Sequence, residues 1–205
     1  HSRRAMANAS LVLLKGKAQV LDIQASSDGV TVGPSAVKGT ATVIKADLEA
    51  SNGVVHIIDD LLEIPADVAT VAKDAGLTTL LSLVVKTGLA GAVTTTPAVT
   101  VFAPTNTAFS KAGISTSNLT AVAEVLKYHV VPAVAYSTSL TNGEKVPTLQ
   151  GGDVTVGVSS SGVTVNGGAN VVAANVLVKN GVVHVIDHVL LPGGGVAGPK
   201  KMTNL

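Results

Sequence analysis

Apolar residues in residues 65–89 and 115–131 recur at spacings of three and four, which is typical of helices that bury one face. Pro65 and Asp67 stand where a first helix would begin, because proline is favoured in the first helical turn. Gly76 interrupts the pattern, and a second helix is expected after it. Ser and Asn residues before Leu119 are candidate caps for a third helix. The apolar positions of these expected helices are Val68, Val71, Ala72, Leu77, Leu80, Leu81, Val84, Leu119, Val122, Val125 and Leu126.

The remaining pattern predicts strands. Residues 153–167 alternate apolar and polar side chains on both sides of a Ser-Gly turn, which predicts a hairpin. Residues 181–192 are rich in β-branched side chains and apolar on both faces, so we expect a buried strand that Pro192 ends. The Gly-rich residues 194–205 resemble a linker and are expected to form a tail.

The chain repeats itself. "NGVVHIIDDLL" at Asn52–Leu62 returns as "NGVVHVIDHVL" at Asn180–Leu190. The expected helices lie ahead of the second copy only. Residues 1–64 are therefore predicted to be the C-terminal half of one unit, and residues 65–193 a complete one.

Composition limits the classes of function. The chain has 205 residues, 46% of them hydrophobic, with no Trp and only two Phe and two Tyr, so aliphatic side chains must fill the core. The absence of Cys excludes disulfides and thiolate metal sites. A net charge of +1 with 13% charged residues gives no basis for a nucleic-acid partner. No apolar run approaches the roughly 20 residues of a membrane span.

The histidines and acids do not predict a metal or a catalytic site. His184 and His188 are four residues apart, about 13 Å along a strand, which is too far to share one metal. His184 and Asp187 recur as His56 and Asp59 in the first copy, whereas Asp60 replaces His188. The recurring pair is interpreted as structural. The sequence also lacks a G-x-S-x-G motif, and Ser159–Ser161 fall in a predicted turn, so we expect no enzyme activity.

"TVFAPTNTAF", Thr100–Phe109, holds both phenylalanines. The segment could be an active-site loop with Thr105 and Asn106 as its polar groups, or a structural junction. We favour the junction, in which a buried strand containing Phe102 ends at a Pro104 turn. Phe109 would then anchor a helical turn, and the two rings would clamp the junction.

Four further residues are candidates for partner contact or for glycosylation. Tyr128 and His129, at the end of the third expected helix, are either a partner-recognition pair or an inward-facing pair that serves the fold, and we favour the fold. Asn8 and Asn118 fit the N-glycosylation pattern, which matters only in a secretory pathway. Asn118 also stands where a helix cap belongs.

In this order the motifs identify a family. The complete unit resembles a fasciclin-type (FAS1) domain: "TVFAPTNTAF" looks like its first signature, Tyr128–His129 like its Tyr-His motif, and "NGVVHVIDHVLLP" like its second signature. The first 64 residues resemble the end of a preceding FAS1 domain. The resemblance implies an α+β fold, a wedge-shaped β-sandwich with several helices on one side. The signature residues are then Thr100, Phe102, Pro104, Thr105, Asn106, Phe109, His184, Asp187, His56 and Asp59.

The resemblance also implies a function without catalysis. We expect an exported, tandem-repeat adhesion module that contacts other proteins or matrix, with Tyr128 and His129 as the partner-contact candidates. Two alternatives stay open: an accessory subunit of a membrane complex on its lumenal or exoplasmic side, and a carrier of a lipophilic ligand such as a carotenoid. No other cofactor is expected.

Overall fold

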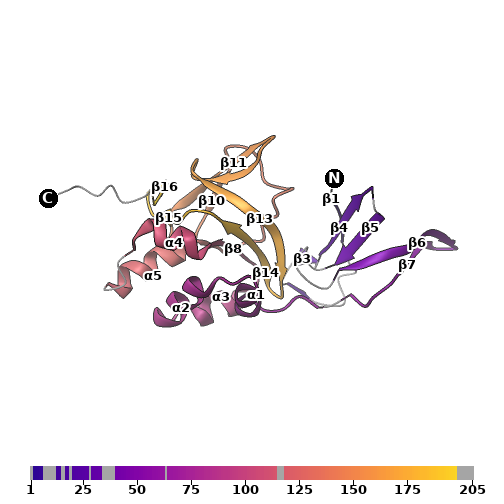
Figure 1. The fold of residues 1–205 in the computed structure, drawn as a ribbon, viewed down its shortest axis with the longest axis horizontal. Helices are drawn as coiled ribbons and strands as arrows, with labels where there is room; N and C mark the ends of the chain where they lie inside the picture. The colour runs from indigo at the N-terminus through magenta and orange to yellow at the C-terminus, as the bar shows by residue number, and fades with distance from the viewer. Residues whose placement is uncertain are drawn as a thin grey trace. The chain divides into compact units, whose positions relative to one another are not determined.

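The structure is a computed structural model that describes residues 2–6, 13–14, 17–18, 20–27, 29–33, 40–62, 64–114 and 118–197. The chain divides into two compact units, His1–Pro65 and Ala66–Leu205 (Figure 1). We call them the first and the second unit.

The first unit is built from strands. Five of them form an antiparallel sheet in the order β1-β4-β5-β6-β7, and β2 pairs with β3. Gly29 adopts a φ of 131° where β5 follows β4, a conformation that favours glycine and permits the tight turn. The strands are β1 (Ser2–Met6), β2 (Leu13–Leu14), β3 (Lys17–Ala18), β4 (Val20–Ser26), β5 (Gly29–Gly33), β6 (Ala41–Ala50) and β7 (Gly53–Ile58).

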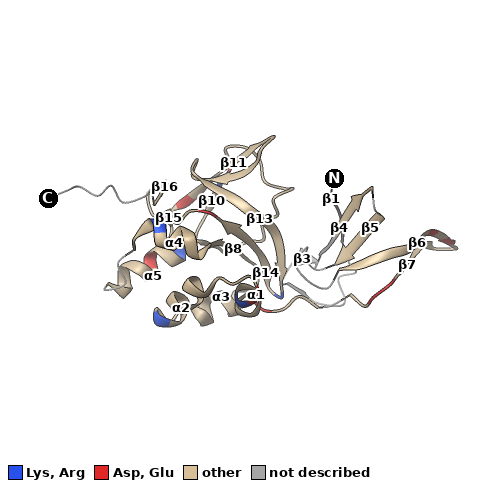
Figure 2. Cartoon of the chain, viewed as in Figure 1, with Lys and Arg blue, Asp and Glu red and all other residues tan. Residues whose placement is uncertain are grey.

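The second unit begins with helices. The expected helices at residues 65–89 and 115–131 are present, and two short ones lie between them. Asp67 caps the first helix by accepting a hydrogen bond from the Thr70 amide at 2.9 Å. The last turns of four helices carry a lysine, which interacts favourably with the helix dipole (Figure 2). The helices are α1 (Val68–Asp74), α2 (Thr78–Lys86), α3 (Ala90–Thr95), α4 (Asn106–Ala112) and α5 (Leu119–Tyr128).

Seven strands of the second unit form one sheet in the order β10-β11-β12-β13-β14-β8-β9. Its neighbours pair antiparallel except β14 and β8, which run parallel. A further short pair joins β15 to β16. The strands are β8 (Val99–Pro104), β9 (Val130–Val131), β10 (Lys145–Pro147), β11 (Asp153–Ser159), β12 (Gly162–Val165), β13 (Ala169–Val178), β14 (Gly181–Ile186), β15 (Leu190–Leu191) and β16 (Gly195–Val196).

Two apolar clusters pack against opposite faces of the parallel pair. Val101 and Val183 face the cluster that includes the helices, whereas Phe102 and Ile186 face a cluster formed mainly by β10–β13. Every residue of β8 and β14 is buried, as expected for strands covered on both sides. The α+β prediction, a β-sandwich with helices on one side, is confirmed.

Two expectations for the C-terminal part need correction. The strand expected to reach Pro192 ends at Ile186. Asp187 still binds residue 170 through its backbone amide and its side chain, and a separate short strand, Leu190–Leu191, follows. The expected tail also starts later than residue 194. Gly195–Val196 pair with β15, and the Ala197 amide donates to the Val189 carbonyl at 2.8 Å, so these residues belong to the folded unit.

Candidate functional site

The parallel pair β8–β14 depends on a close backbone approach at Gly181. A Cβ atom at this position would lie 1.8 Å from the Val99 carbonyl oxygen, so a side chain is incompatible with the pairing. The preceding Asn180 closes the same end: its carbonyl accepts from the Val99 amide at 3.0 Å. Its side-chain amide donates to the carbonyls of Val93 and Thr96, at 2.9 and 2.8 Å. Asn180 and Gly181 thus join the sheet to the end of α3.

Thr100, the first polar residue of the predicted signature, is fully buried on β8. Its hydroxyl donates to the Ala133 carbonyl at 2.6 Å and accepts from the Ala135 amide at 2.8 Å. The Thr100 hydroxyl therefore fixes the loop after β9 to β8 through both hydrogen bonds, which is a structural role.

Thr105 and Asn106 form the junction between β8, which ends at Pro104, and α4. The Thr105 hydroxyl caps the helix by accepting from the Ala108 amide at 3.1 Å. Asn106 accepts from the Thr79 amide at 3.0 Å and donates to the Gly76 carbonyl at 2.8 Å, so its side chain ties α4 to the turn between α1 and α2. These polar groups are bound to backbone, as in a structural junction.

The two phenylalanine rings separate at this junction. Phe102 is buried in the cluster of strands β10–β13 and stacks on the His184 ring, with centroids 5.6 Å apart and planes 27° apart. Phe109 is buried in the other cluster, with the helices. Instead of one clamp, each ring anchors a different core, because Phe102 leaves the sheet on one face and α4 lies on the other.

Tyr128 is fully buried at the end of α5. Its hydroxyl donates to the Asp153 carbonyl at 2.6 Å and accepts from the Asn166 side-chain amide at 3.2 Å. The ring also lies against Gly152, where a Cβ atom would be 3.2 Å from it. Tyr128 therefore holds α5 to β11 and the turn after β12.

His129 is also buried, and backbone groups bind both of its ring nitrogens. Nε2 accepts from the Leu190 amide at 2.9 Å, so the proton resides on Nδ1, which donates to the Val125 carbonyl at 2.7 Å. Burial lowers the pKa of His129 from 6.5 to about 4, although the bond to Val125 partly opposes this. The imidazole is neutral near pH 7 and inaccessible to a partner in this conformation.

His184 and Asp187, the pair in the second signature, bind different parts of the fold. His184 Nδ1 accepts from the Asn175 amide at 3.2 Å, so Nε2 carries the proton and donates to the Ala135 carbonyl at 2.8 Å. Asp187 accepts from the Asn170 amide at 2.7 Å and is 2.7 Å from His188 Nδ1. Burial raises the pKa of Asp187, but hydrogen bonds from Asn170 and His188 outweigh it and leave the pKa below its usual value.

The first unit repeats part of this arrangement. His56 Nδ1 accepts from the Asp47 amide at 3.2 Å, and Asp59 accepts from the Thr42 amide at 2.6 Å. These bonds correspond, at an offset of 128 residues, to those of His184 and Asp187. His56 and Asp59 differ from their counterparts in being exposed.

Of the two glycosylation candidates, the structure describes only Asn118. Asn118 is exposed and caps α5, with its side-chain oxygen accepting from the Ala121 amide at 3.1 Å. A glycan would attach to the side-chain nitrogen of Asn118, which takes no part in this hydrogen bond. Asn8 lies outside the described residues.

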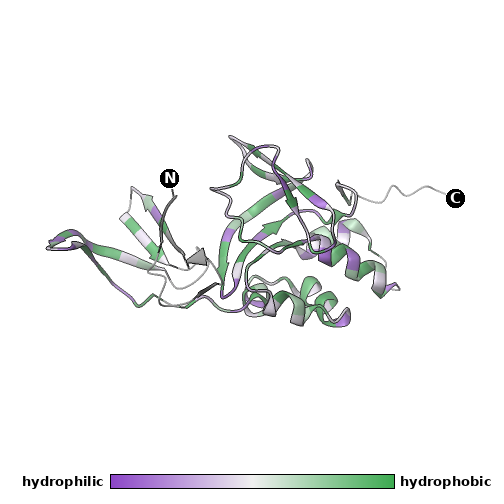
Figure 3. Ribbon diagram, turned by 180° about the vertical axis from the view of Figure 1, so that it is seen from behind, coloured by the Kyte–Doolittle hydropathy of each residue, from purple (hydrophilic) through white to green (hydrophobic). Residues whose placement is uncertain are grey.

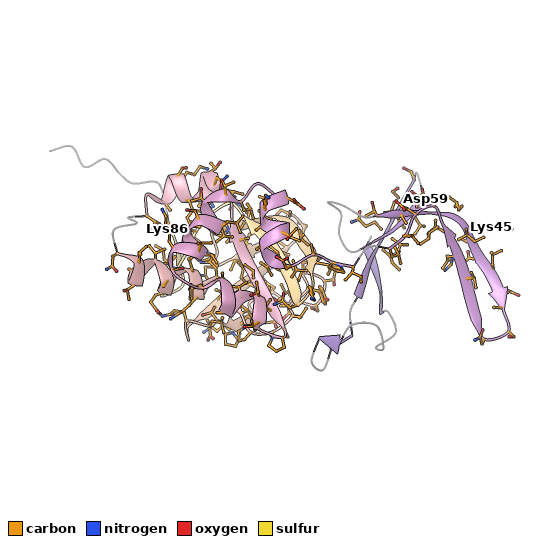
Figure 4. All side chains as sticks on the ribbon, turned by 90° about the horizontal axis from the view of Figure 1, so that it is seen from below. Lys45, Asp59 and Lys86 are labelled. Carbon is orange, nitrogen blue, oxygen red and sulfur yellow. The ribbon has the colours of Figure 1, made fainter. Side chains whose placement is uncertain are left out.

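An apolar pocket between α1, α2, α3 and α5 is the feature that sequence reasoning missed. It encloses a cavity of about 90 Å³, and Val85, 70% exposed, lies at its edge. Lys86, labelled in Figure 4, follows at the end of α2. The apolar residues at 80, 81, 83, 84 and 85 were a signal, because a helix that is apolar on more than one face has more surface than its core contact requires. The pocket is lined by Val68, Ala69, Ala72, Leu80, Leu81, Val84, Val85, Leu89, Ala90, Val93, Thr94, Val101, Leu126, His129 and Val130.

Within the described residues, no group of three or more His, Cys, Asp or Glu is placed to hold a metal ion. In the same part of the chain, no helix is long and apolar enough to cross a membrane.

The chain matches known proteins over most of its length. Residues 6–65 and 75–192 match the family model for the Fasciclin domain. A fasciclin-like arabinogalactan protein of Arthroderma benhamiae is 32% identical over 175 residues, which are 84% of this chain and 41% of the relative. Periostin of Homo sapiens is 31% identical over 159 residues, 74% of this chain and 19% of the relative. The chain thus spans less than half the length of these two relatives.

Two other matches cover more of the related protein. Protein sll1483 of Synechocystis sp. is 33% identical over 162 residues, 75% of this chain and 89% of the relative. Among solved structures, a FAS1 domain pair from the insect cell adhesion molecule Fasciclin I matches with a TM-score of 0.56 and 22% identity. That match covers 90% of this chain and 72% of the pair, and it establishes the shared fold.

Proposed function

Since this chain belongs to the fasciclin domain family, we propose that it is a non-catalytic adhesion module that contacts other proteins through apolar surface on α1–α3. The observation that carries this proposal is the exposed Val85 at the edge of an apolar pocket. An exposed apolar side chain beside further apolar surface is typical of a contact site.

The polar residues of the signatures support the same proposal. Thr100, Tyr128 and His129 are buried, and their polar atoms bind backbone or side-chain groups of the fold. A catalytic residue needs a group that can reach a substrate. We therefore assign these residues to stability and place the interaction on the surface. Adhesion also requires an exported location, which agrees with the naming of the solved relative as a cell adhesion molecule.

Binding to immobilised matrix proteins tests the proposal. An extracellular matrix extract is immobilised on one sensor and the chain itself on another. Binding of the chain in solution to each sensor is then measured by biolayer interferometry. We expect saturable binding on one of them, weakened at least about tenfold by Val85→Glu, because a charge at an apolar contact must be desolvated. Val172→Glu, an equally polar change on β13, is the matched control. Absence of saturable binding on both sensors would contradict the proposal.

A second candidate, carriage of a lipophilic ligand such as a carotenoid, is favoured by the pocket alone. Its lining is almost wholly apolar, but about 90 Å³ is smaller than the 300–1,000 Å³ of ordinary ligand sites. One end of a polyene would fit, and the rest would require α1–α3 to separate.

Reconstitution with β-carotene tests this candidate. If the pocket carries the ligand, the purified complex shows a visible absorption band, and Ala69→Phe, which fills the mouth of the pocket, removes it. Ala121→Phe, on an exposed face of α5 away from the pocket, should keep the band. A complex without visible absorption would remove the carrier from consideration and leave the adhesion proposal untouched.

A further inference from the structure

The hairpin β6–β7 of the first unit is a structural copy of β13–β14. Both hairpins shift register at equivalent points, between Val43 and Lys45 in one and between Val171 and Ala173 in the other. Each also places one non-glycine residue at positive φ, Asp47 at 57° and Asn175 at 59°. In each hairpin the amide of that residue donates to the histidine of the signature at 3.2 Å. Figure 4 labels Lys45, on β6, and Asp59, which directly follows β7.

The two copies differ in what covers them. In the second unit, β14 lies between β13 and β8, whereas β7 is the last strand of its sheet among the residues that the structure describes. The apolar side chains of β7 are consequently open to solvent. The green segments along this hairpin in Figure 3 mark its hydrophobic residues. Exposed fractions are 57% for Val54, 51% for Val55 and 42% for Ile57, against 0%, 2% and 9% for Val182, Val183 and Val185. A long edge strand with an exposed apolar face is a template for pairing with another chain.

No contact among the described residues of the first unit requires glycine at position 53. Its φ lies outside the left-handed region, and a Cβ atom there would meet nothing within 4 Å. Its counterpart Gly181 is required because a Cβ atom there would lie 1.8 Å from the Val99 carbonyl oxygen of β8. Gly53 therefore preserves the space for a strand that pairs with β7 as β8 pairs with β14.

Two polar residues of β7 and its preceding turn are the same as the residues that bind the helices and the loop after β9 in the second unit. Asn52 corresponds to Asn180, whose side chain binds carbonyls at the end of α3. His56 corresponds to His184, whose Nε2 donates to the Ala135 carbonyl. Asn52 and His56 are both exposed in the first unit. The groups bound by the Asn180 side chain and by His184 Nε2 belong to residues 93–135.

We propose that β7 is the docking surface for the helix-and-strand half of a fasciclin domain, a polypeptide with the layout of residues 66–136. Its strand pairs in parallel with β7 at Gly53, and its helices cover Val55 and Ile57. The loop after the counterpart of β9 supplies a carbonyl that accepts a hydrogen bond from His56 Nε2, as the Ala135 carbonyl does for His184 in the second unit. The β14–β8 interface of the second unit is the established form of this contact, of which the first unit carries one side.

The test joins the proposed occupant to residues 1–205. A second copy of residues 66–136 is joined ahead of residue 1 through a flexible Gly/Ser linker, which gives an effective concentration near the millimolar range. Hydrogen exchange is then followed at the amides of β7. We expect their exchange to slow at least about 100-fold relative to the unextended chain, because amides paired in a sheet exchange only on opening.

Gly53→Val in the extended chain should abolish this protection, whereas Ser51→Val should keep it, since the counterpart Lys179 shows that position 51 has room for a side chain. Equal exchange in the extended and unextended chains would overturn the proposal, as would protection that survives Gly53→Val. Sedimentation of the unextended chain tests whether β7 instead pairs with a second copy of the chain. A dimer with protected β7 amides would show that the occupant is a second copy of this chain, which also overturns the proposal.

Discussion

Replacing Phe102 with alanine is expected to lower the free energy of unfolding of the second unit by about 3–5 kcal/mol. The ring is only 1% exposed and contributes to the cluster that joins β8 to β10–β13. Its removal leaves a cavity and also takes away the stacking partner of His184. Because a dense core relaxes only partly, the transfer cost and the cavity cost add.

Tyrosine fluorescence during urea or thermal unfolding measures this loss. Both tyrosines, Tyr128 and Tyr136, belong to the second unit, so the signal reports on that unit alone. We expect the thermal midpoint to fall by at least about 10 °C. Leu119→Ala, a truncation at an exposed apolar site, is the matched control and should shift it little. An unchanged midpoint for Phe102→Ala would restore the interpretation of Thr100–Phe109 as an active-site loop.

The sequence predicted elements and their order better than contacts. Helical spacing located α1, α2 and α5, and the cap residues Asp67 and Asn118 were visible because capping depends on neighbours within three residues. The parallel pairing of β8 with β14 was not visible. It joins segments about 80 residues apart, and a run apolar on both faces indicates burial without naming the partner strand.

Contacts that cross the fold were equally hidden. Asn106 reads as a turn residue in the sequence, yet its side chain binds the turn between α1 and α2, about 30 residues away. The apolar neighbours of His129 indicated that its ring faces inward. The hydrogen bond from the Leu190 amide to Nε2 could not be predicted, because it depends on tertiary structure.

The repeated segment shows that burial, too, cannot be predicted from the local sequence. Val54 and Val182 are identical residues in nearly identical segments, and yet one is exposed and the other fully buried. The difference arises from β8 and the helices, which cover one copy and have no equivalent among the described residues of the first unit. Local sequence therefore determines the hairpin, whereas burial depends on the rest of the domain.

The second large effect is acid destabilisation through His129. In the folded chain its pKa is about 4, against 6.5 for an unperturbed histidine, because the ring is buried and neutral. Between these values the unfolded state binds a proton that the folded state does not bind, so stability falls as pH falls from 6.5 to 4. Each pH unit removes at most about 1.4 kcal/mol, and the total loss is about 3 kcal/mol.

Urea unfolding at several pH values measures the slope, and His129→Gln identifies its source. Glutamine does not titrate, so although the variant is less stable throughout, its free energy of unfolding should change far less between pH 6.5 and 4. Asp67 and Asp187 do not obscure the result. Their pKa values lie below the ordinary 3.8, so most of the stability that they contribute is lost below pH 4. A variant that keeps the wild-type slope would show that another group titrates, and that the His129 ring is not the buried neutral link between α5 and Leu190.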